Sequence, residues 1–335
     1  MPVEPDLPRA VASPINTPAS GLTRARLLRL AAGIAAGTLG LASQAQRLAP
    51  SGSSGNPAPS KPMNTRPIPS TGEALPVIGC GTWVGFGHAP DSADYSRLPG
   101  VLDALFAAGG KLLDSSPMYG RSEENTGALL AAAQAHGKAF LATKVWTRGR
   151  DAGIAQMEAS FKHLRTRRID LMQVHNLVDT RTHLATLRRW KDEGRVRYIG
   201  VTHYTASAHG EVEDALRKEK LDFVQINYSI DAREAEERLL PLAAERGVAV
   251  IVNLPFGGGG LLRQLRDKPL PGWAAEIGCE SWAQVLLKFV LGHPAVTCTI
   301  PGTSRAEHMA QNAAAGVGPT PDAQFWRRHA GSIPL

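Results

Sequence analysis

Four residues of types that transfer or orient protons stand at or just after the ends of three apolar stretches: Asp114, Tyr119, Lys144 and His175. The stretches span residues 111–114, 141–144 and 169–175. Apolar runs that stop at turn-forming residues are typical of buried strands. One aspartate followed by a tyrosine would indicate only a surface turn with a half-exposed ring. The same arrangement at three successive strand ends predicts a catalytic site.

The chemistry of these four side chains is coherent. An unperturbed phenol titrates near pH 10, so a tyrosine alone is a poor proton donor at neutral pH. A lysine ammonium beside it stabilises the tyrosinate and is expected to lower the pKa of the phenol. An aspartate keeps the lysine charged and in place, and a histidine can orient a substrate oxygen by a hydrogen bond. The set predicts protonation of a carbonyl oxygen while a hydride arrives at the carbonyl carbon.

Eight strand-like segments alternate with helical segments along the chain. The strands are predicted near residues 76–83, 111–114, 141–144, 169–175, 196–202, 222–227, 248–252 and 296–300. Helices are predicted over 98–108, 124–136, 152–164, 184–192 and 234–246, with one more after the last strand. This alternation predicts an α/β fold, a parallel (β/α)8 TIM barrel. In such a barrel the carboxyl ends of all strands open onto one face, which would bring the four residues together.

The segment 114–127 reads Asp-Ser-Ser-Pro-Met-Tyr-Gly-Arg-Ser-Glu-Glu-Asn-Thr-Gly and, with Lys144 and His175, resembles the aldo-keto reductase family. The resemblance covers residues from about 76 to about 312. It implies an NAD(P)H-dependent oxidoreductase in which the four residues form the catalytic tetrad and Tyr119 is the general acid. It also implies NADP(H) as cofactor, with NAD(H) as the alternative, a small-molecule carbonyl substrate, and a hairpin of residues 66–75 across the barrel floor.

The nucleotide would be held by loops of the barrel, because no Gly-x-Gly-x-x-Gly opens a helix after a strand. The resemblance implies that Gln225 contacts the nicotinamide amide and that Tyr228 stacks on its ring. Thr202 and His203 stand where many relatives have Ser-Asn. Other positions expected to bind cofactor are Thr82, Trp83, Leu254, Phe256, Gly257, Gly302, Thr303, Arg305, Gln311 and Asn312. The glycine run 257–260 permits close approach of backbone amides to a pyrophosphate, although such a run alone is more often a mobile loop.

Arg305 is the one strong cation at the start of the helix after the last strand. The family often has a lysine and a second arginine here for the adenosine 2′-phosphate, and this chain has Gly302 and His308 at those places. A preference for NADPH is therefore expected to depend mainly on Arg305. The alternative is a solvated arginine in an enzyme that accepts both nucleotides or prefers NADH.

Aromatic residues near the strand ends could form an apolar substrate pocket. Trp83 matches a pocket tryptophan of the family, Trp146 is as well explained by ordinary packing, and Phe86 is a third candidate. The tail after Asn312 is short, so large C-terminal loops over the substrate are not expected.

Charge and cysteine usage exclude several classes of protein. The net charge is +7, but residues 1–70 carry +5 of it and the other 265 residues only +2. A nearly neutral globular part argues against nucleic acid as a partner. The three cysteines, Cys80, Cys279 and Cys298, lack metal-ligand spacing, so we expect buried thiols and no metal.

Residues 1–70 are predicted to be a leader and a disordered linker, and residues 71–335 the barrel. The first 70 residues hold 11 of the 24 prolines. Arg24, Arg26 and Arg29 precede an apolar stretch and then Ser-Gln-Ala at 43–45, which is the order of an export signal peptide. The apolar stretch is too short and too rich in glycine for a stable membrane span.

The leader resembles a twin-arginine signal, although Ala25 separates its two arginines. This predicts a twin-arginine-type export machinery as partner, a periplasmic location and a mature terminus near Gln46. The alternative is a basic extension on a cytoplasmic enzyme.

Two other functions are open at this stage. A redox sensor or assembly subunit would bind the nucleotide with little turnover, whereas a complete tetrad favours an enzyme. A different barrel enzyme would use Lys144 as a Schiff-base amine, against which the neighbouring Asp-Tyr pattern argues.

Overall fold

The computed structural model describes residues 62–335. The predicted export signal and the linker up to residue 61 lie outside the described residues, so the leader and its location stay predictions.

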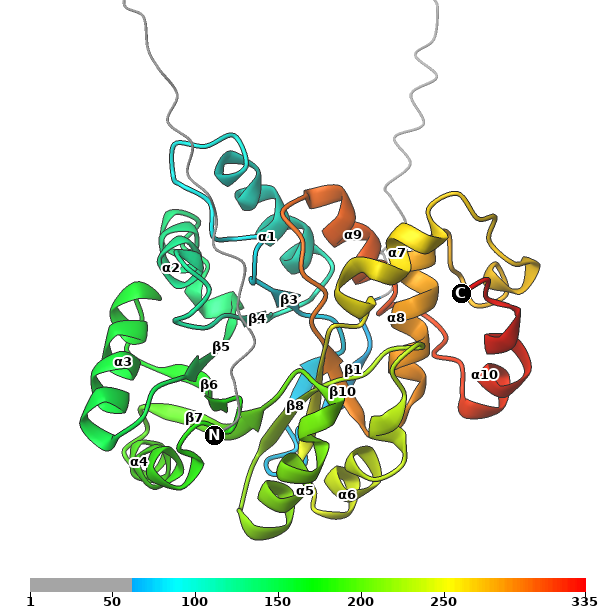
Figure 1. The fold of residues 1–335 in the computed structure, drawn as a ribbon. Coiled ribbons are helices and arrows are strands. Elements are labelled where there is room, and N and C mark those ends of the chain that lie inside the picture. The colour runs from blue at the N-terminus through cyan, green and yellow to red at the C-terminus, as the bar shows by residue number, and fades with distance from the viewer. Residues whose placement is uncertain (1–61) are drawn as a thin grey trace, which may run out of the picture. The chain divides into compact units, whose positions relative to one another are not determined.

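Eight parallel strands form one sheet, ordered along the chain from β3 to β10 (Figure 1). Parallel bridges from Ile78 to Thr299 and from Gly81 to Gly302 join the first strand to the last and close the barrel. The predicted (β/α)8 barrel is confirmed. The strands are β3 (Cys80–Gly81), β4 (Leu112–Asp114), β5 (Phe140–Val145), β6 (Ile169–His175), β7 (Val196–Thr202), β8 (Phe223–Asn227), β9 (Ala249–Asn253) and β10 (Val296–Thr299).

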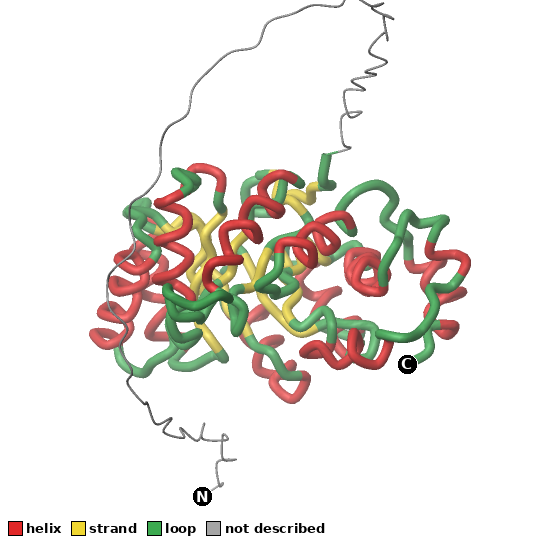
Figure 2. The backbone as a smooth tube through the Cα atoms, turned by 90° about the horizontal axis from the view of Figure 1, so that it is seen from above, coloured by secondary structure: helices red, strands yellow, loops and turns green. Residues whose placement is uncertain are grey.

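Helices surround these strands on all sides (Figure 2). They are α1 (Leu98–Ala107), α2 (Ser122–Ala132), α3 (Arg150–His163), α4 (Thr180–Asp192), α5 (His209–Lys218), α6 (Leu239–Glu245), α7 (Gly260–Leu265), α8 (Trp282–Gly292), α9 (Ala306–Ala314) and α10 (Ala323–His329). The tail after residue 312 forms α10, whose Trp326 ring lies 5.4 Å from Phe289 of α8. The tail therefore packs on the helix layer. No helix of the described part is long and apolar enough to cross a membrane.

An antiparallel hairpin, β1 (Thr65–Pro67) with β2 (Ala74–Pro76), closes the amino end of the barrel. Its Ile68 and Leu75 are buried against inward-facing residues of the strands, among them Phe140, Leu171 and Phe223. The hairpin expected from the family resemblance is confirmed. The predicted boundary at residue 70 assigns residues 62–70 to the linker, whereas β1 and the buried Ile68 join this segment to the barrel. Its polar, proline-rich composition concealed Ile68, which packs into the floor.

Successive inward positions along each strand change from apolar to polar. On β5 they are Phe140, Ala142 and Lys144, and β6 likewise runs from Leu171 to His175. Because strand side chains alternate between the two faces, every second residue points into the barrel. The polar residues thus collect at the carboxyl end. The three cysteines are unpaired and buried, as expected.

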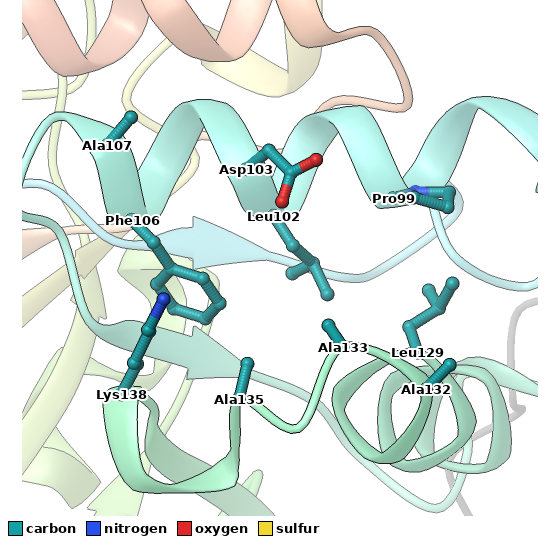
Figure 3. A pocket seen from close by; sticks show the side chains of 10 residues that line it. All are labelled: Pro99, Leu102, Asp103, Phe106, Ala107, Leu129, Ala132, Ala133, Ala135 and Lys138. Atoms are coloured by element: carbon teal, nitrogen blue, oxygen red, sulfur yellow. The ribbon is translucent and has the colours of Figure 1, made fainter.

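Two neighbouring helices of the outer layer enclose a groove. An apolar groove of about 630 Å³ lies between α1 and α2, with Leu102 and Phe106 on one side and Leu129 and Ala133 on the other (Figure 3). All its lining residues belong to these helices and to the connection after α2. The groove is therefore separate from the strand ends that carry the tetrad.

Candidate active site

Asp114 and Lys144 form a buried ion pair at the carboxyl ends of β4 and β5. Lys144 Nζ lies 2.6 Å from Asp114 Oδ2 and also donates to the carbonyl oxygen of Ser115 at 2.7 Å. The two side chains are 1% and 3% exposed. Burial lowers the pKa of Lys144, but Asp114 and Tyr119 more than offset this, so the pKa lies above its ordinary value. Lys144 is a fixed, fully charged group.

Tyr119 stands over this pair in the turn that follows β4. Lys144 Nζ lies 5.0 Å from the centre of the phenol ring. Burial raises the pKa of Tyr119, the charge of Lys144 lowers it, and the net shift is upward from 10. Lys144 thus lowers the pKa of the phenol as expected, but the loss of water around the phenol outweighs the nearby ammonium.

His175 ends β6 and also contacts the phenol. Its ring meets Tyr119 edge to face, with ring centres 6.0 Å apart. Ser116 Oγ lies 3.2 Å from Nδ1. Burial and the charge of Lys144 lower the pKa of His175 to about 3, so the imidazole is neutral at pH 7. The structure thus brings all four predicted residues into one cluster.

Gln173 completes this cluster and was missed from the sequence. Its Nε2 donates to Asp114 Oδ1 at 3.4 Å, and its side chain is fully buried. It stands two residues before His175 on the same strand, so the alternation of the strand faces it toward the same interior. That spacing was the available signal.

The neighbouring strand ends offer hydrogen bonds to an amide. Thr202 Oγ1 donates to Gln225 Oε1 at 2.8 Å, which leaves the buried Gln225 Nε2 without a partner in the described chain. His203 Nδ1 accepts from the backbone N–H groups of Tyr204 and Thr205. This fixes the ring proton on Nε2, where it can be donated. A buried amide donor without a partner fits a carboxamide ligand such as that of nicotinamide.

The sequence model of the Aldo/keto reductase family matches residues 77–328. The chain belongs to this family. The reductase is 28% identical over 260 residues to "Methylglyoxal reductase YeaE" of Escherichia coli (strain K12), which covers 75% of this chain and 89% of the relative. It is also 28% identical over 228 residues to an "Aldo-keto reductase" of Mycobacterium sp. (strain KMS), with 65% and 76% covered.

Two solved structures from Klebsiella pneumoniae are similar to the reductase. An aldo-keto reductase in complex with NADPH superposes with a TM-score of 0.69 and 26% identity, covering 81% of this chain and 95% of its own. An aldo/keto reductase in complex with NADP and acetate superposes with a TM-score of 0.66 and 26% identity, covering 78% of this chain and 93% of its own.

Three residues that were predicted to contact the cofactor or the substrate are buried in the structure. Tyr228 is buried, donates to Glu236 Oε1 at 2.6 Å and packs 5.7 Å from Phe289 of α8, so it is not free to stack on a nicotinamide. Phe86 is fully buried in the core and does not line a pocket. Thr82 is fully buried, and its hydroxyl donates to the backbone oxygen of Asp114 at 3.0 Å, so it fixes a strand end instead of meeting the nucleotide.

The open mouth of the barrel has aromatic walls. Trp83 is 58% exposed with its ring 6.5 Å from Tyr119, and Trp146 is 41% exposed with its ring 6.4 Å from His175. Trp146 thus lies beside His175 with part of its ring open to solvent. Met118 and Tyr204 are exposed as well. Such a surface suits an apolar or small carbonyl compound.

The glycine run after β9 has an unusual backbone. Gly257, Gly258 and Gly259 all have positive φ, the left-handed region that favours glycine. Leu254 also has a positive φ and is partly exposed, whereas Phe256 is buried in the outer core. Arg263, missed from the sequence, lies over this run, since a Cβ at Gly259 would be 3.3 Å from its Nη1.

The start of α9 carries the remaining predicted positions. Arg305 precedes the helix, its side chain 55% exposed, and its backbone N–H donates to Thr303 Oγ1 at 3.1 Å. Gly302 and Gln311 are exposed and Asn312 is buried. Thus the catalytic end of the predicted site is closely packed, and the outer end is open.

Proposed function

We propose that this enzyme reduces aldehydes or ketones to alcohols with NADPH and that Tyr119 delivers the proton. The observation that carries the proposal is the buried Lys144–Asp114 pair beside the Tyr119 ring, with a neutral His175 edge to face with the same ring. Buried ionisable groups at the mouth of a barrel are candidates for catalysis.

The cofactor assignment is supported by the match between the site and the ligands of the relatives. The two Klebsiella structures hold NADP or NADPH. Gln225 would hold the carboxamide through its unpartnered Nε2, with His203 Nε2 as a second donor. Gly257 and Arg305 would hold the phosphates. When bound, NADPH supplies a hydride to the carbonyl carbon.

Each tetrad residue then has a defined task. The raised pKa of Tyr119 keeps its hydroxyl protonated at neutral pH, so the proton is available until charge develops on the substrate oxygen. Lys144 stabilises the phenolate that remains, and Asp114 holds Lys144 in place. Ser116 Oγ lies 3.2 Å from Nδ1 of His175, and in the tautomer in which Nδ1 accepts this hydrogen bond, Nε2–H is left to orient the carbonyl oxygen.

A Schiff-base mechanism is disfavoured by the state of the lysine. An amine that attacks a carbonyl must lose its charge, which is commonly achieved by a lowered pKa. Lys144 instead has a raised pKa and donates to both Asp114 and Ser115.

The test is binding followed by turnover. NADPH and NADH are titrated against the purified protein by fluorescence, and then oxidation of NADPH is followed with a carbonyl panel. Methylglyoxal comes first, because one relative bears the name of a methylglyoxal reductase. Tight nucleotide binding without turnover of any carbonyl would favour the sensor or assembly function instead.

We also propose export of the enzyme, supported by the basic, apolar and small-residue order of residues 23–45. N-terminal sequencing of protein from the native host should find a terminus near Gln46 outside the cytoplasm. An intact Met1 or Pro2 in a cytoplasmic fraction would contradict it.

A further inference from the structure

A cavity of about 410 Å³ lies where the connection from β3 to α1 meets the start of α9. Its lining residues are Arg97, Arg305, Ala306 and Glu307. Two of the four are arginines, and they come from segments at opposite ends of the barrel sequence. Arg97 was not among the predicted cofactor residues.

Close backbone contacts hold these two segments together. A Cβ at Gly85 would lie 3.0 Å from the carbonyl oxygen of Thr303, and one at Gly100 would lie 3.2 Å from Ala306 Cβ. The bridge between Gly81 and Gly302 lies next to them. Arg97 and Arg305 are therefore presented to one cavity by a fixed scaffold.

Position 302, where relatives have a lysine, lies beside this closure. A Cβ there would be 3.1 Å from the carbonyl oxygen of Gly81, so a side chain needs this neighbour to shift by a few tenths of an ångström. With glycine at 302, a second cation for the cavity comes from another segment, and Arg97 is in that position.

Each arginine is paired with an exposed carboxylate that a phosphate can displace. Arg97 Nη1 lies 2.7 Å from Asp94 Oδ1, and Arg305 Nη1 lies 3.8 Å from Glu307 Oε1. All four side chains are at least half exposed. Exposed pairs of this kind contribute little, so a doubly charged phosphate can replace a carboxylate. Guanidinium groups match the oxygens of a phosphate in charge and in geometry.

We propose that Arg97 is a specificity-determining residue that binds the adenosine 2′-phosphate of NADPH together with Arg305. This inference rests on the proposed function, since it concerns the nucleotide of that reaction. Arg97 and Arg305 divide the task that a lysine and a second arginine would otherwise perform beside Gly302.

The test measures binding and needs no turnover. Dissociation constants for NADPH and NADH are measured by fluorescence, and those for 2′,5′-ADP and ADP by calorimetry, on the full chain. Arg97→Ala should weaken NADPH and 2′,5′-ADP by about ten- to a hundredfold and change NADH and ADP by less than about twofold. Arg97→Lys, which keeps the charge but not the fork, should recover part of the loss.

Two further variants give the controls. Asp94→Asn removes the competitor of the phosphate and should leave NADPH binding equal or tighter. Arg189→Ala removes a half-exposed arginine paired with Glu193 on α4 and should alter neither nucleotide. If Arg97→Ala weakens the binding of both nucleotides equally, or of neither, the inference about Arg97 is overturned. The proposed function still stands in that case, provided that the wild-type enzyme binds NADPH. A wild-type enzyme that binds no nucleotide overturns both.

Discussion

The two ends of the barrel interior are built by the same strands and differ in how they are filled. At the floor, Phe140, Tyr198 and Phe223 pack on one another with ring centres 5.4 to 6.1 Å apart, under the hairpin residues Ile68 and Leu75. At the mouth, the same strands present Lys144, Thr202 and Gln225. The floor is apolar and closed, and the mouth is polar and holds buried amide atoms without partners.

This difference assigns stability to the floor and function to the mouth. A floor of interlocking rings needs no ligand to be complete. The mouth contains a buried charge pair and an unpartnered amide. Burying such groups lowers the stability of the fold unless a bound ligand supplies the missing hydrogen bonds. Conservative substitutions at the two ends should therefore affect different measurements.

Tyr119→Phe should have the largest effect, on turnover alone. It deletes the hydroxyl that delivers the proton and little else, and general acid catalysis is worth about 10²–10⁴-fold in rate. The steady-state rate of NADPH oxidation should fall by this factor, with the NADPH dissociation constant within about twofold of wild type. A variant that keeps more than half of the wild-type turnover would remove Tyr119 from the role of acid.

Lys144→Met should damage both stability and activity. The variant leaves Asp114 buried without its partner, and breaking a buried pair costs about 3–5 kcal/mol. Urea unfolding measures the free energy, and the pH profile of the remaining turnover should shift because the phenol loses its charged neighbour. The matched control is Lys218→Met, whose ion pair with Asp214 has the same 2.6 Å distance but is exposed, so little or no loss of stability is expected. Equal losses in the two variants would show that burial does not matter here.

His175 should make the folded protein less stable as the pH falls below about 6.5. Its pKa is about 3 in the fold and near 6.5 when unfolded, so between these values the unfolded state binds the extra proton. Stability therefore rises with pH across this window, by up to about 1.4 kcal/mol per pH unit. Unfolding at pH 5 and pH 7.5 measures it, and His175→Asn should flatten the difference. His308→Asn, at an exposed histidine, is the control.

The catalytic cluster could be predicted from the sequence because strand geometry nearly determines it. Asp114, Lys144 and His175 each end an apolar stretch, and parallel strands bring such ends to one edge. The alternation of strand faces would have added Gln173 by the same reasoning. The family resemblance supplied the floor hairpin, which composition alone had assigned to the linker.

A role taken from the family resemblance was less dependable than the strand pattern. Tyr228 follows β8 directly, and its ring turns outward to Glu236 and α8, as alternation from the inward-facing Phe223 and Gln225 places it. The pKa of Tyr119 depends on how much water its ring excludes, which no spacing of residues reveals. Arg97 meets Arg305 only through tertiary packing of distant segments.

Tyr198→Phe should have the smallest effect, on stability alone. This is the same chemical change as Tyr119→Phe, made at the floor. The hydroxyl donates to Glu73 Oε2 at 2.6 Å and lies 2.8 Å from Thr71 Oγ1, while the ring contacts would remain. The net loss of one such hydrogen bond is about 0.5–1.5 kcal/mol in urea unfolding, with turnover and NADPH binding unchanged.

The pH dependence of the stability lost in Tyr198→Phe shows whether the loss comes from the hydrogen bond to Glu73. Burial raises the pKa of Glu73, but the hydrogen bonds from Tyr198 and Arg197 lower it further, so the pKa lies below its ordinary value of 4.5. A group with a lowered pKa in the fold stabilises the protein above its unfolded pKa and stops doing so as the pH falls through the folded one. The difference between wild type and Tyr198→Phe should therefore be full at pH 6 and shrink below about pH 4.5. A loss of turnover in Tyr198→Phe comparable to that in Tyr119→Phe would contradict the division between a structural floor and a catalytic mouth.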